Sequence, residues 1–393
     1  MADALTPDGL RRFGEVAADH VANGGVPGLV ALVARHDQMH VEAHGSLDAG
    51  GGTQPRPVRR DSLFRIASTT KPIMGAATMA LIDEGRLALD GPVDTLLPEL
   101  AGARVLRSPD GPLDDTVPAR RAITVRDLLT FTFGFGMAME MFTAPQPWPV
   151  VQAANDLHLA TLGPPQPQEP PGPDAWMAAL GSLPLLAHPG ERWLYNTGAQ
   201  VLGVLAARAA GMPLDDVLRT RLFEPLGMRD TAFHTTDTSR LATAYVPTQH
   251  GLQTWDPPDG QWSTPPRFPD AAAGLVSTAD DLLAFARMLL RNGDGVLSPP
   301  SVRAMTTDQL TAEQKAQAGS GILGDSGWAF CQAVVIDGPR SGAYGWAGGL
   351  GSTWLVDPHR DMVTIVLCQR LFDSPQPPAV HRELQDAAYA AVT

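Results

Sequence analysis

The alternation of apolar and polar positions predicts helices and strands in separate parts of the chain. Residues 6–23 form an amphipathic segment that begins with Thr-Pro, a pair typical of a helix start. The runs PGLVALVARH and MHVEAHG, separated by Asp-Gln, indicate a β-hairpin. Between residues 68 and 84 the apolar positions recur at helical spacing, so a core-facing helix is expected there.

The middle of the chain is helical in pattern, with glycine and proline between the segments. TVRDLLTFT begins with Thr124, a favourable N-cap, and STADDLLAFARMLLRNG also has the pattern of a capped helix. GPPQPQEPPGP, residues 163–173, predicts an exposed irregular loop. The last third returns to strand-like runs, GWAFCQAVVI, STWLVD and MVTIVLC, before a final helix at about 379–391.

Strands near both termini with helices between them predict an α/β fold. One sheet would be assembled from the two ends of the chain, with a mostly helical lobe inserted. We expect residues 1–85 and 240–393 to form the α/β lobe and residues 86–239 the helical lobe.

Composition and charge narrow the classes of function. The chain has 393 residues, 44% hydrophobic and 18% charged, which is typical of a globular protein. The net charge of −13 disfavours nucleic acid and anionic membranes as partners. Neither a secretory signal nor a membrane-spanning run is visible, so a cytoplasmic location is expected. Cys331 and Cys368 are expected to be buried free thiols, and no spacing of histidine or cysteine indicates a metal or cofactor.

The segment FRIASTTKPI carries the first candidate chemistry. Ser68 and Lys71 are three residues apart, and Lys71 is one of only two lysines in the chain. On a helix beginning at Ser68 the two side chains share a face. Serine is a weak nucleophile without a base, and a lysine can act as that base if burial or a helix N-terminus lowers its pKa. The plainer alternative is a capped surface helix with an ordinary lysine.

Three separated segments, FRIASTTKPI, LFEPLGMRDTAF and AAGLVSTADDLLAFARMLL, resemble the serine β-lactamase-like superfamily. The resemblance is to class C β-lactamases and to the related carboxylesterases of family VIII, and it covers most of the chain. It implies an antiparallel sheet flanked by helices, with an active site in the cleft between the two lobes.

The resemblance also implies three active-site elements. Its Ser-x-x-Lys element matches Ser68 and Lys71. Its Tyr-x-Asn element corresponds to RWLYNTGAQVLGVL and gives Tyr195, whose plainer alternative is a half-buried core tyrosine. Its Lys-Thr-Gly element corresponds to residues 346–348, Trp-Ala-Gly, which looks like the Trp-x-Gly variant of the esterase branch. A glycine-rich turn before a strand is the alternative for that run.

The family pattern assigns roles to these residues. Ser68 would attack the acyl carbonyl, and Lys71 and Tyr195 would share the general-base work and protonate the leaving group. The backbone N–H groups of Ser68 and Gly349 would form the oxyanion hole. Water would then release the acyl group from Ser68.

Two departures from the family pattern bear on the substrate. The asparagine of the second element is Thr197 here, with Asn196 one place early, and the lysine of the third element is Trp346. In relatives that cleave β-lactams or D-alanyl peptides that lysine helps to hold a substrate carboxylate. Trp346 and Gly348 would instead offer the substrate an apolar wall and a close backbone, which suits a neutral ester. Arg340 could supply a compensating charge.

The predicted function is a serine carboxylesterase acting on short- to medium-chain acyl esters through an acyl-serine intermediate, without a cofactor. A β-lactamase or D-alanyl peptidase, an acyltransferase, and a catalytically silent binding protein are the alternatives. The segment from residue 134 to 176 is rich in Met, Phe, Trp and Pro. It could line the acyl pocket or pack between the lobes.

Overall fold

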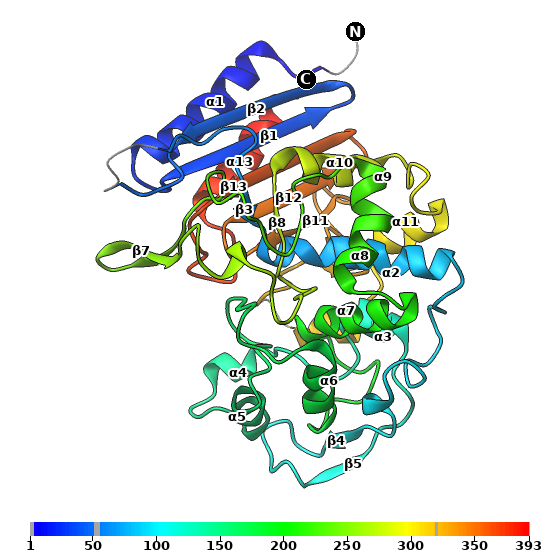
Figure 1. The fold of residues 1–393 in the computed structure, drawn as a ribbon. Helices are drawn as coiled ribbons and strands as arrows, with labels where there is room; N and C mark the ends of the chain where they lie inside the picture. The colour runs from blue at the N-terminus through cyan, green and yellow to red at the C-terminus, as the bar shows by residue number, and fades with distance from the viewer. Residues whose placement is uncertain (1–3, 51–55, 319–320, 393) are drawn as a thin grey trace.

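A seven-stranded antiparallel sheet forms the centre of the computed structural model, which describes residues 4–50, 56–318 and 321–392. Its strand order is β2-β1-β13-β12-β11-β10-β9. Figure 1 shows β1 and β2, from the start of the chain, beside β13 and β12, from its end. The predicted assembly of one sheet from both chain ends is therefore confirmed. The strands are β1 Gly28–Arg35, β2 Gln38–Gly45, β9 Gly327–Trp328, β10 Ala333–Val334, β11 Tyr344–Gly348, β12 Ser352–Asp357 and β13 Met362–Cys368.

The hydrophobic pattern of the strands explains which of them lie inside. Every residue of β1 and β13 is buried, whereas β2 is exposed or half-exposed throughout and forms an edge. Alternate residues of β1 face two different cores. One core lies under α1 (Pro7–Ala22) and α13 (Ala379–Ala390), and the other includes residues of α10 (Ala279–Leu290). The sheet is thus covered on both faces.

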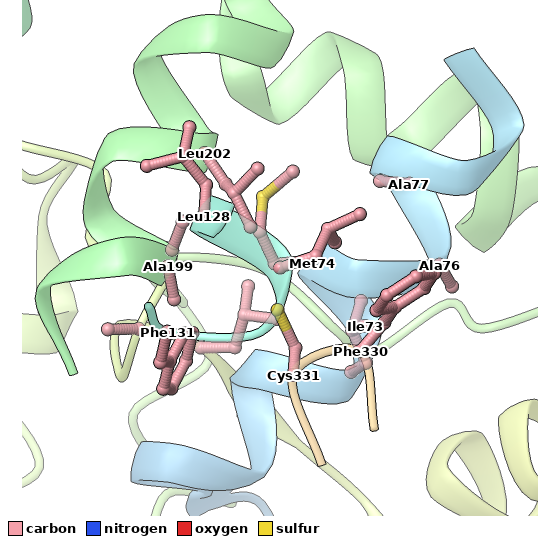
Figure 2. Packing of buried hydrophobic residues seen from close by; sticks show 14 of the residues in the cluster. Ile73, Met74, Ala76, Ala77, Leu128, Phe131, Ala199, Leu202, Phe330 and Cys331 are labelled. Carbon is pink, nitrogen blue, oxygen red and sulfur yellow. The ribbon is translucent and has the colours of Figure 1, made fainter. Parts of the chain in front are cut away.

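Helix α2 (Thr70–Asp83) lies in the middle of the larger core. All its residues from Thr70 to Leu81 are buried, so the helix has no solvent-facing side over three turns. Figure 2 shows apolar side chains of α2 among those of α3 (Val125–Leu129), α7 (Thr197–Ala210) and the turn with Phe330 and Cys331. A Cβ on Gly75 would lie 3.0 Å from Phe330 O, so this turn packs directly on the helix.

The segment between residues 86 and 239 contains most of the remaining helices. They are α3, α4 Glu140–Thr143, α5 Pro149–Asp156, α6 Pro173–Gly181, α7, α8 Leu214–Leu218 and α9 Glu224–Leu226, with 3₁₀ turn Pro98–Leu100 and short strands β4 Arg104–Leu106 and β5 Thr116–Pro118. A π-helical turn joins α8 to α9. The division into two lobes at these boundaries stays a prediction.

The other elements follow in the second half of the chain or pair with it. They are β3 Phe64–Arg65 with β8 Val276–Ser277, the hairpin of β6 Ala244–Thr248 and β7 Gly251–Asp256, 3₁₀ turn Gln261–Ser263, α11 Pro299–Met305 and α12 Ala312–Ala318. Threonines begin three helices as predicted: the side chains of Thr6, Thr124 and Thr278 each accept a backbone N–H of the first turn. Within the described ranges, no helix has the length and apolar character needed to cross a bilayer.

Two expectations from the sequence were wrong in part. GWAFCQAVVI was expected to be one strand, but it forms only the two-residue strands β9 and β10 around a turn. The backbone leaves the sheet there because Cys331 donates its N–H to Leu129 O at 2.9 Å, with a φ of 62°. The expected loop is irregular over residues 163–172, while Pro173 already begins α6, and Pro165, Pro167 and Pro170 are buried instead of exposed. Both cysteines are free and buried, as predicted.

Gly348, at the end of β11, lies where the sheet packs closely on the turn before α2. A Cβ there would collide with Ile66 O and Ser352 Oγ, whereas a Cβ on the neighbouring Gly349 would meet no atom within 4 Å. Gly348→Ala should therefore lower the unfolding free energy by roughly 2 kcal/mol or more, because the strand must move away. Gly349→Ala should change it by less than about 0.5 kcal/mol. Urea unfolding of both variants measures this, and equal stabilities would contradict the packing argument.

Candidate active site

Ser68 lies in a tight turn that leads into α2. The preceding Ala67 has a φ of 43°, a strained value for a residue with a Cβ, and Ala67–Thr69 form a 3₁₀ turn. The α-helix itself begins at Thr70, so the predicted start at Ser68 lies two residues too early. No side chain caps either helix start. Ser68 is half-exposed between buried neighbours, and its hydroxyl is left for other partners.

Lys71 is completely buried one turn further along the chain. Its ammonium donates to Ser68 Oγ at 2.9 Å and to Ala272 O at 2.9 Å. Burial lowers the pKa of Lys71 to about 7, while electrostatic interactions with Asp270 and then with Cys331 oppose that shift. A substantial fraction of the amine is therefore neutral near pH 7, as a base for Ser68 requires.

The backbone around Tyr195 is fixed by a short bridge to another segment. Met137 N donates to Tyr195 O at 2.8 Å, and Tyr195 N donates to Met137 O at 2.9 Å. Asn196 then takes a φ of 81°, which turns the chain sharply into α7. Asn196 Nδ2 donates to Thr161 O at 3.1 Å and holds this turn. These hydrogen bonds fix the backbone from which the Tyr195 side chain extends.

The Tyr195 side chain contacts Trp346, Ser68 and Lys71. Its hydroxyl accepts a hydrogen bond from Trp346 Nε1 at 2.7 Å and is hydrogen-bonded to the Ser68 hydroxyl. Lys71 Nζ lies 4.5 Å from the centroid of its ring. Burial raises the pKa of Tyr195 well above its usual value, so the phenol keeps its proton at neutral pH.

The structure thus brings Ser68, Lys71 and Tyr195 into one hydrogen-bonded group. When Lys71 is neutral, the Ser68 hydroxyl can donate its proton to the amine, while the phenol stays close to the same oxygen. Such a group can supply a nucleophile, a base and an acid to one reacting carbonyl.

The third predicted element lies on β11, beside this group. The Trp346 ring is 5.7 Å from the Tyr195 ring and 4.8 Å from the Trp328 ring, centroid to centroid. Gly348 allows the strand to approach Ile66 O, and Ser352 Oγ on the next strand donates to the same carbonyl at 2.6 Å. The sheet is therefore attached directly to the turn that presents Ser68.

A pocket of about 770 Å³ opens over Ser68. Its wall is mainly apolar, and it includes Tyr195, Trp346 and Gly349. None of the described residues that line it is a lysine or an arginine. The other lining residues are Ala67, Met137, Met139, Phe142, Ala160, Gly163, Pro164, Pro165, Asn196, Asp270, Ala273, Ile322, Leu323, Ser326, Ala347, Leu350, Leu371, Phe372, Asp373, Ser374, Pro375, Gln376 and Pro377. An anionic substrate would find no side-chain cation on this wall.

Arg340, the residue considered as a compensating charge, does not line the pocket. Its guanidinium donates to Gln385 Oε1 at 2.9 Å and to Asp386 Oδ1 at 2.6 Å on α13, and it stacks 4.0 Å above the Tyr389 ring. Arg340 is therefore engaged with α13 and not with the pocket wall beside Trp346.

Both alternatives for the segment from residue 134 to 176 are partly right. Met137, Met139 and Phe142 line the pocket, and the Phe142 side chain is exposed at its mouth. Trp176 is instead fully buried and stacks on Phe268. At the second element, Asn196 lines the pocket, and Thr197, which stands where the family has asparagine, is buried at the start of α7.

Sequence reasoning missed Asp270, Ala272 and Cys331. All three act on Lys71: Ala272 as a hydrogen-bond acceptor, and Asp270 and Cys331 through electrostatic interactions that raise its pKa. No spacing in the sequence relates them to Lys71, which is about 200 residues away from the first two. Among the described residues, no group of three or more His, Cys, Asp or Glu side chains is arranged to hold a metal ion.

Comparison with known proteins gives the family. The sequence model of the family described as Beta-lactamase matches residues 13–389. The chain belongs to the beta-lactamase family. It is 30% identical over 389 residues to "Esterase EstB" of Burkholderia gladioli, covering 92% of this chain and 91% of the esterase. It is also 39% identical over 368 residues to "Protein Rv1367c" of Mycobacterium tuberculosis, covering 89% and 87%.

A solved structure agrees with this membership. "EstCE1, a hydrolase with promiscuous acyltransferase activity" is 26% identical and superimposes with a TM-score of 0.79, covering 97% of this chain and 99% of that one. The predicted superfamily and its fold are thereby confirmed, including the antiparallel sheet with flanking helices.

The burial of Lys71 predicts a pH-dependent stability. The amine has a pKa of about 7 in the folded protein and about 10.5 when unfolded, so between these values the unfolded chain binds a proton that the folded chain lacks. Stability relative to Lys71→Met should therefore be lowest below pH 7 and rise toward pH 10, by at most ~1.4 kcal/mol per pH unit. Urea unfolding at several pH values measures it. Lys315→Met, which removes the surface pair with Asp308, is the control, and parallel curves for both variants would contradict the prediction.

Proposed function

We propose that this protein is a serine carboxylesterase of the family VIII type that hydrolyses neutral, short- to medium-chain acyl esters. The observation that carries the proposal is the hydrogen-bonded group of Ser68, Lys71 and Tyr195 at the base of an apolar pocket. The similarity to EstB and EstCE1 supports ester hydrolysis on this fold.

The acylation step follows from the positions of these groups. Neutral Lys71 accepts the proton of Ser68 as Oγ forms a bond to the acyl carbon. The carbonyl electron pair moves to its oxygen, which accepts hydrogen bonds from the backbone N–H groups of Ser68 and Gly349. When this intermediate collapses, the bond to the alcohol oxygen breaks. Lys71 returns the proton to that oxygen, with the Tyr195 phenol donating beside it.

Hydrolysis of the acyl-serine repeats the sequence with water. A water molecule attacks the acyl carbon and gives its proton to Lys71, and the bond to Ser68 Oγ breaks. Oγ takes back a proton, and the carboxylic acid leaves. The same residues thus act as base in one half of each step and as acid in the other.

The charge of the pocket favours a neutral ester over a β-lactam or a D-alanyl peptide. Trp346 stands where the carboxylate-holding lysine of such enzymes would be, and Arg340 is engaged with α13. A substrate carboxylate would lose its hydration without gaining a cationic partner. A catalytically silent protein would have no need of a buried lysine beside a serine, because burying that charge lowers stability.

Ser68→Ala should abolish turnover of p-nitrophenyl butyrate, by about 10³-fold or more, because no covalent intermediate can form. Intact-mass measurement after brief exposure to the ester should show an acyl adduct on the parent protein and none on Ser68→Ala. Ser374→Ala, which removes a second pocket hydroxyl, is the matched control and should still form the adduct. Unchanged turnover by Ser68→Ala, or nitrocefin turnover far above ester turnover, would overturn the proposal.

Trp346→Phe should lower kcat about tenfold with little change in KM, because the Tyr195 hydroxyl loses a hydrogen bond worth about 1–1.5 kcal/mol. Trp354→Phe is the matched control, since Trp354 Nε1 is buried without a hydrogen-bond partner among the described residues. Steady-state kinetics on p-nitrophenyl butyrate compares the two. Equal losses in both variants would assign the effect to packing and not to the indole N–H.

A further inference from the structure

A buried carboxylate lies in the pocket wall next to the Ser68 group. Asp270 is only 6% exposed. Its Oδ1 accepts the N–H of Ala272 at 2.8 Å, and its backbone carbonyl accepts the N–H groups of Ala273 at 3.1 Å and Gly274 at 2.7 Å. Its other oxygen has a long contact to Gln200 Nε2, at 3.5 Å, and the Ala273 N–H also favours the ionised carboxylate. The aspartate thus closes the turn of residues 270–274 on itself.

This turn holds the second hydrogen-bond acceptor of Lys71. Ala272 donates its N–H to Asp270 Oδ1 at 2.8 Å, and its carbonyl accepts a hydrogen bond from Lys71 Nζ at 2.9 Å. The Lys71 amine is therefore positioned between Ser68 Oγ and a carbonyl whose orientation depends on Asp270. Without the carboxylate the turn would lose the side-chain acceptor of its central N–H.

Four polar groups from different elements face the Lys71 amine. The Ser68 and Tyr195 hydroxyls are neutral, and burial raises the pKa of the Cys331 thiol, which is therefore neutral as well. Burial also raises the pKa of Asp270, but the N–H of Ala272 and the charge of Lys71 favour its anion. Asp270 is thus the acidic group that opposes the effect of burial on Lys71.

We propose that Asp270 is a positioning residue for Lys71, a role that rests on the proposed function. Through the turn it orients Ala272 O, which keeps the amine against Ser68 Oγ, and through its charge it sets the pH above which the amine acts as a base. The carboxylate forms no bond with the substrate in either half-reaction. Its removal should therefore change how the reaction depends on pH, and not only how fast it is.

The test compares the rate of Ser68 labelling by a fluorophosphonate at pH 6 and pH 8. With a base titrating near pH 7, the parent protein should label at pH 6 at about one tenth of its pH 8 rate. Asp270→Asn keeps an acceptor for Ala272 N–H but removes the charge, so the base should titrate roughly one pH unit lower. The labelling rate at pH 6 divided by the rate at pH 8 should then rise about fivefold over that of the parent protein. Asp270→Ala removes both the acceptor and the charge, so its labelling rate at pH 8 should also fall at least about tenfold.

Matched variants separate the outcomes. Asp373→Asn removes another pocket carboxylate, one that is exposed and paired with Arg370, and should keep the ratio of the parent. Asp270→Ser is a second neutral variant in case the asparagine variant does not fold, and Asp270→Glu should restore the pH dependence. A uniform loss of rate with an unchanged ratio would leave Asp270 a structural residue and overturn the inference. Absence of Ser68 labelling in the parent protein would instead overturn the proposed function, and the inference with it.

Discussion

The removal of the Lys71 amine from water is the constraint on which the site depends. A lysine at the surface keeps its proton at neutral pH and cannot accept another from a serine. Helix α2 is buried along three turns, and burial is the largest cause of the lowered pKa of Lys71. Two acceptors, Ser68 Oγ and Ala272 O, satisfy the amine there. The hydrophobic core around α2 would therefore serve the proposed chemistry as well as the stability of the fold.

Such a site cannot exist in a partly folded chain, because its members come from distant segments. Lys71 follows the turn after β3, Tyr195 precedes α7, Asp270 precedes β8 and Trp346 lies on β11. The sheet that carries β11 needs strands from both chain ends. Contacts of such long sequence separation slow folding, because the entropy of closing long loops must be overcome before they form. The low pKa of Lys71 consequently appears only when the core closes and water leaves.

Local patterns gave most of the fold and part of the site. The hairpin of β1 and β2, the helix α13 and the spacing of Ser68 and Lys71 are visible in the sequence, because each is encoded within a few residues. The turn at Cys331 was missed because the apolar residues around it have the pattern of a strand. That strand is interrupted by the hydrogen bond from Cys331 N–H to Leu129 O and by packing of the turn on Gly75. Asp270 was missed for a related reason: its closeness to Lys71 is created by folding alone.

Because Trp346 carries no charge, burial alone must lower the pKa of Lys71. In relatives with a lysine there, a second cation near the first would itself lower the pKa of the helix lysine. Trp346 provides an N–H to Tyr195 but no charge, and Asp270 acts in the opposite direction. Only exclusion of water can then keep the Lys71 amine partly neutral, so any change that hydrates its cavity should raise its pKa and weaken the base. An apolar pocket and a partly neutral amine are thus two consequences of the same packing, and the proposed selectivity for neutral substrates would follow from both.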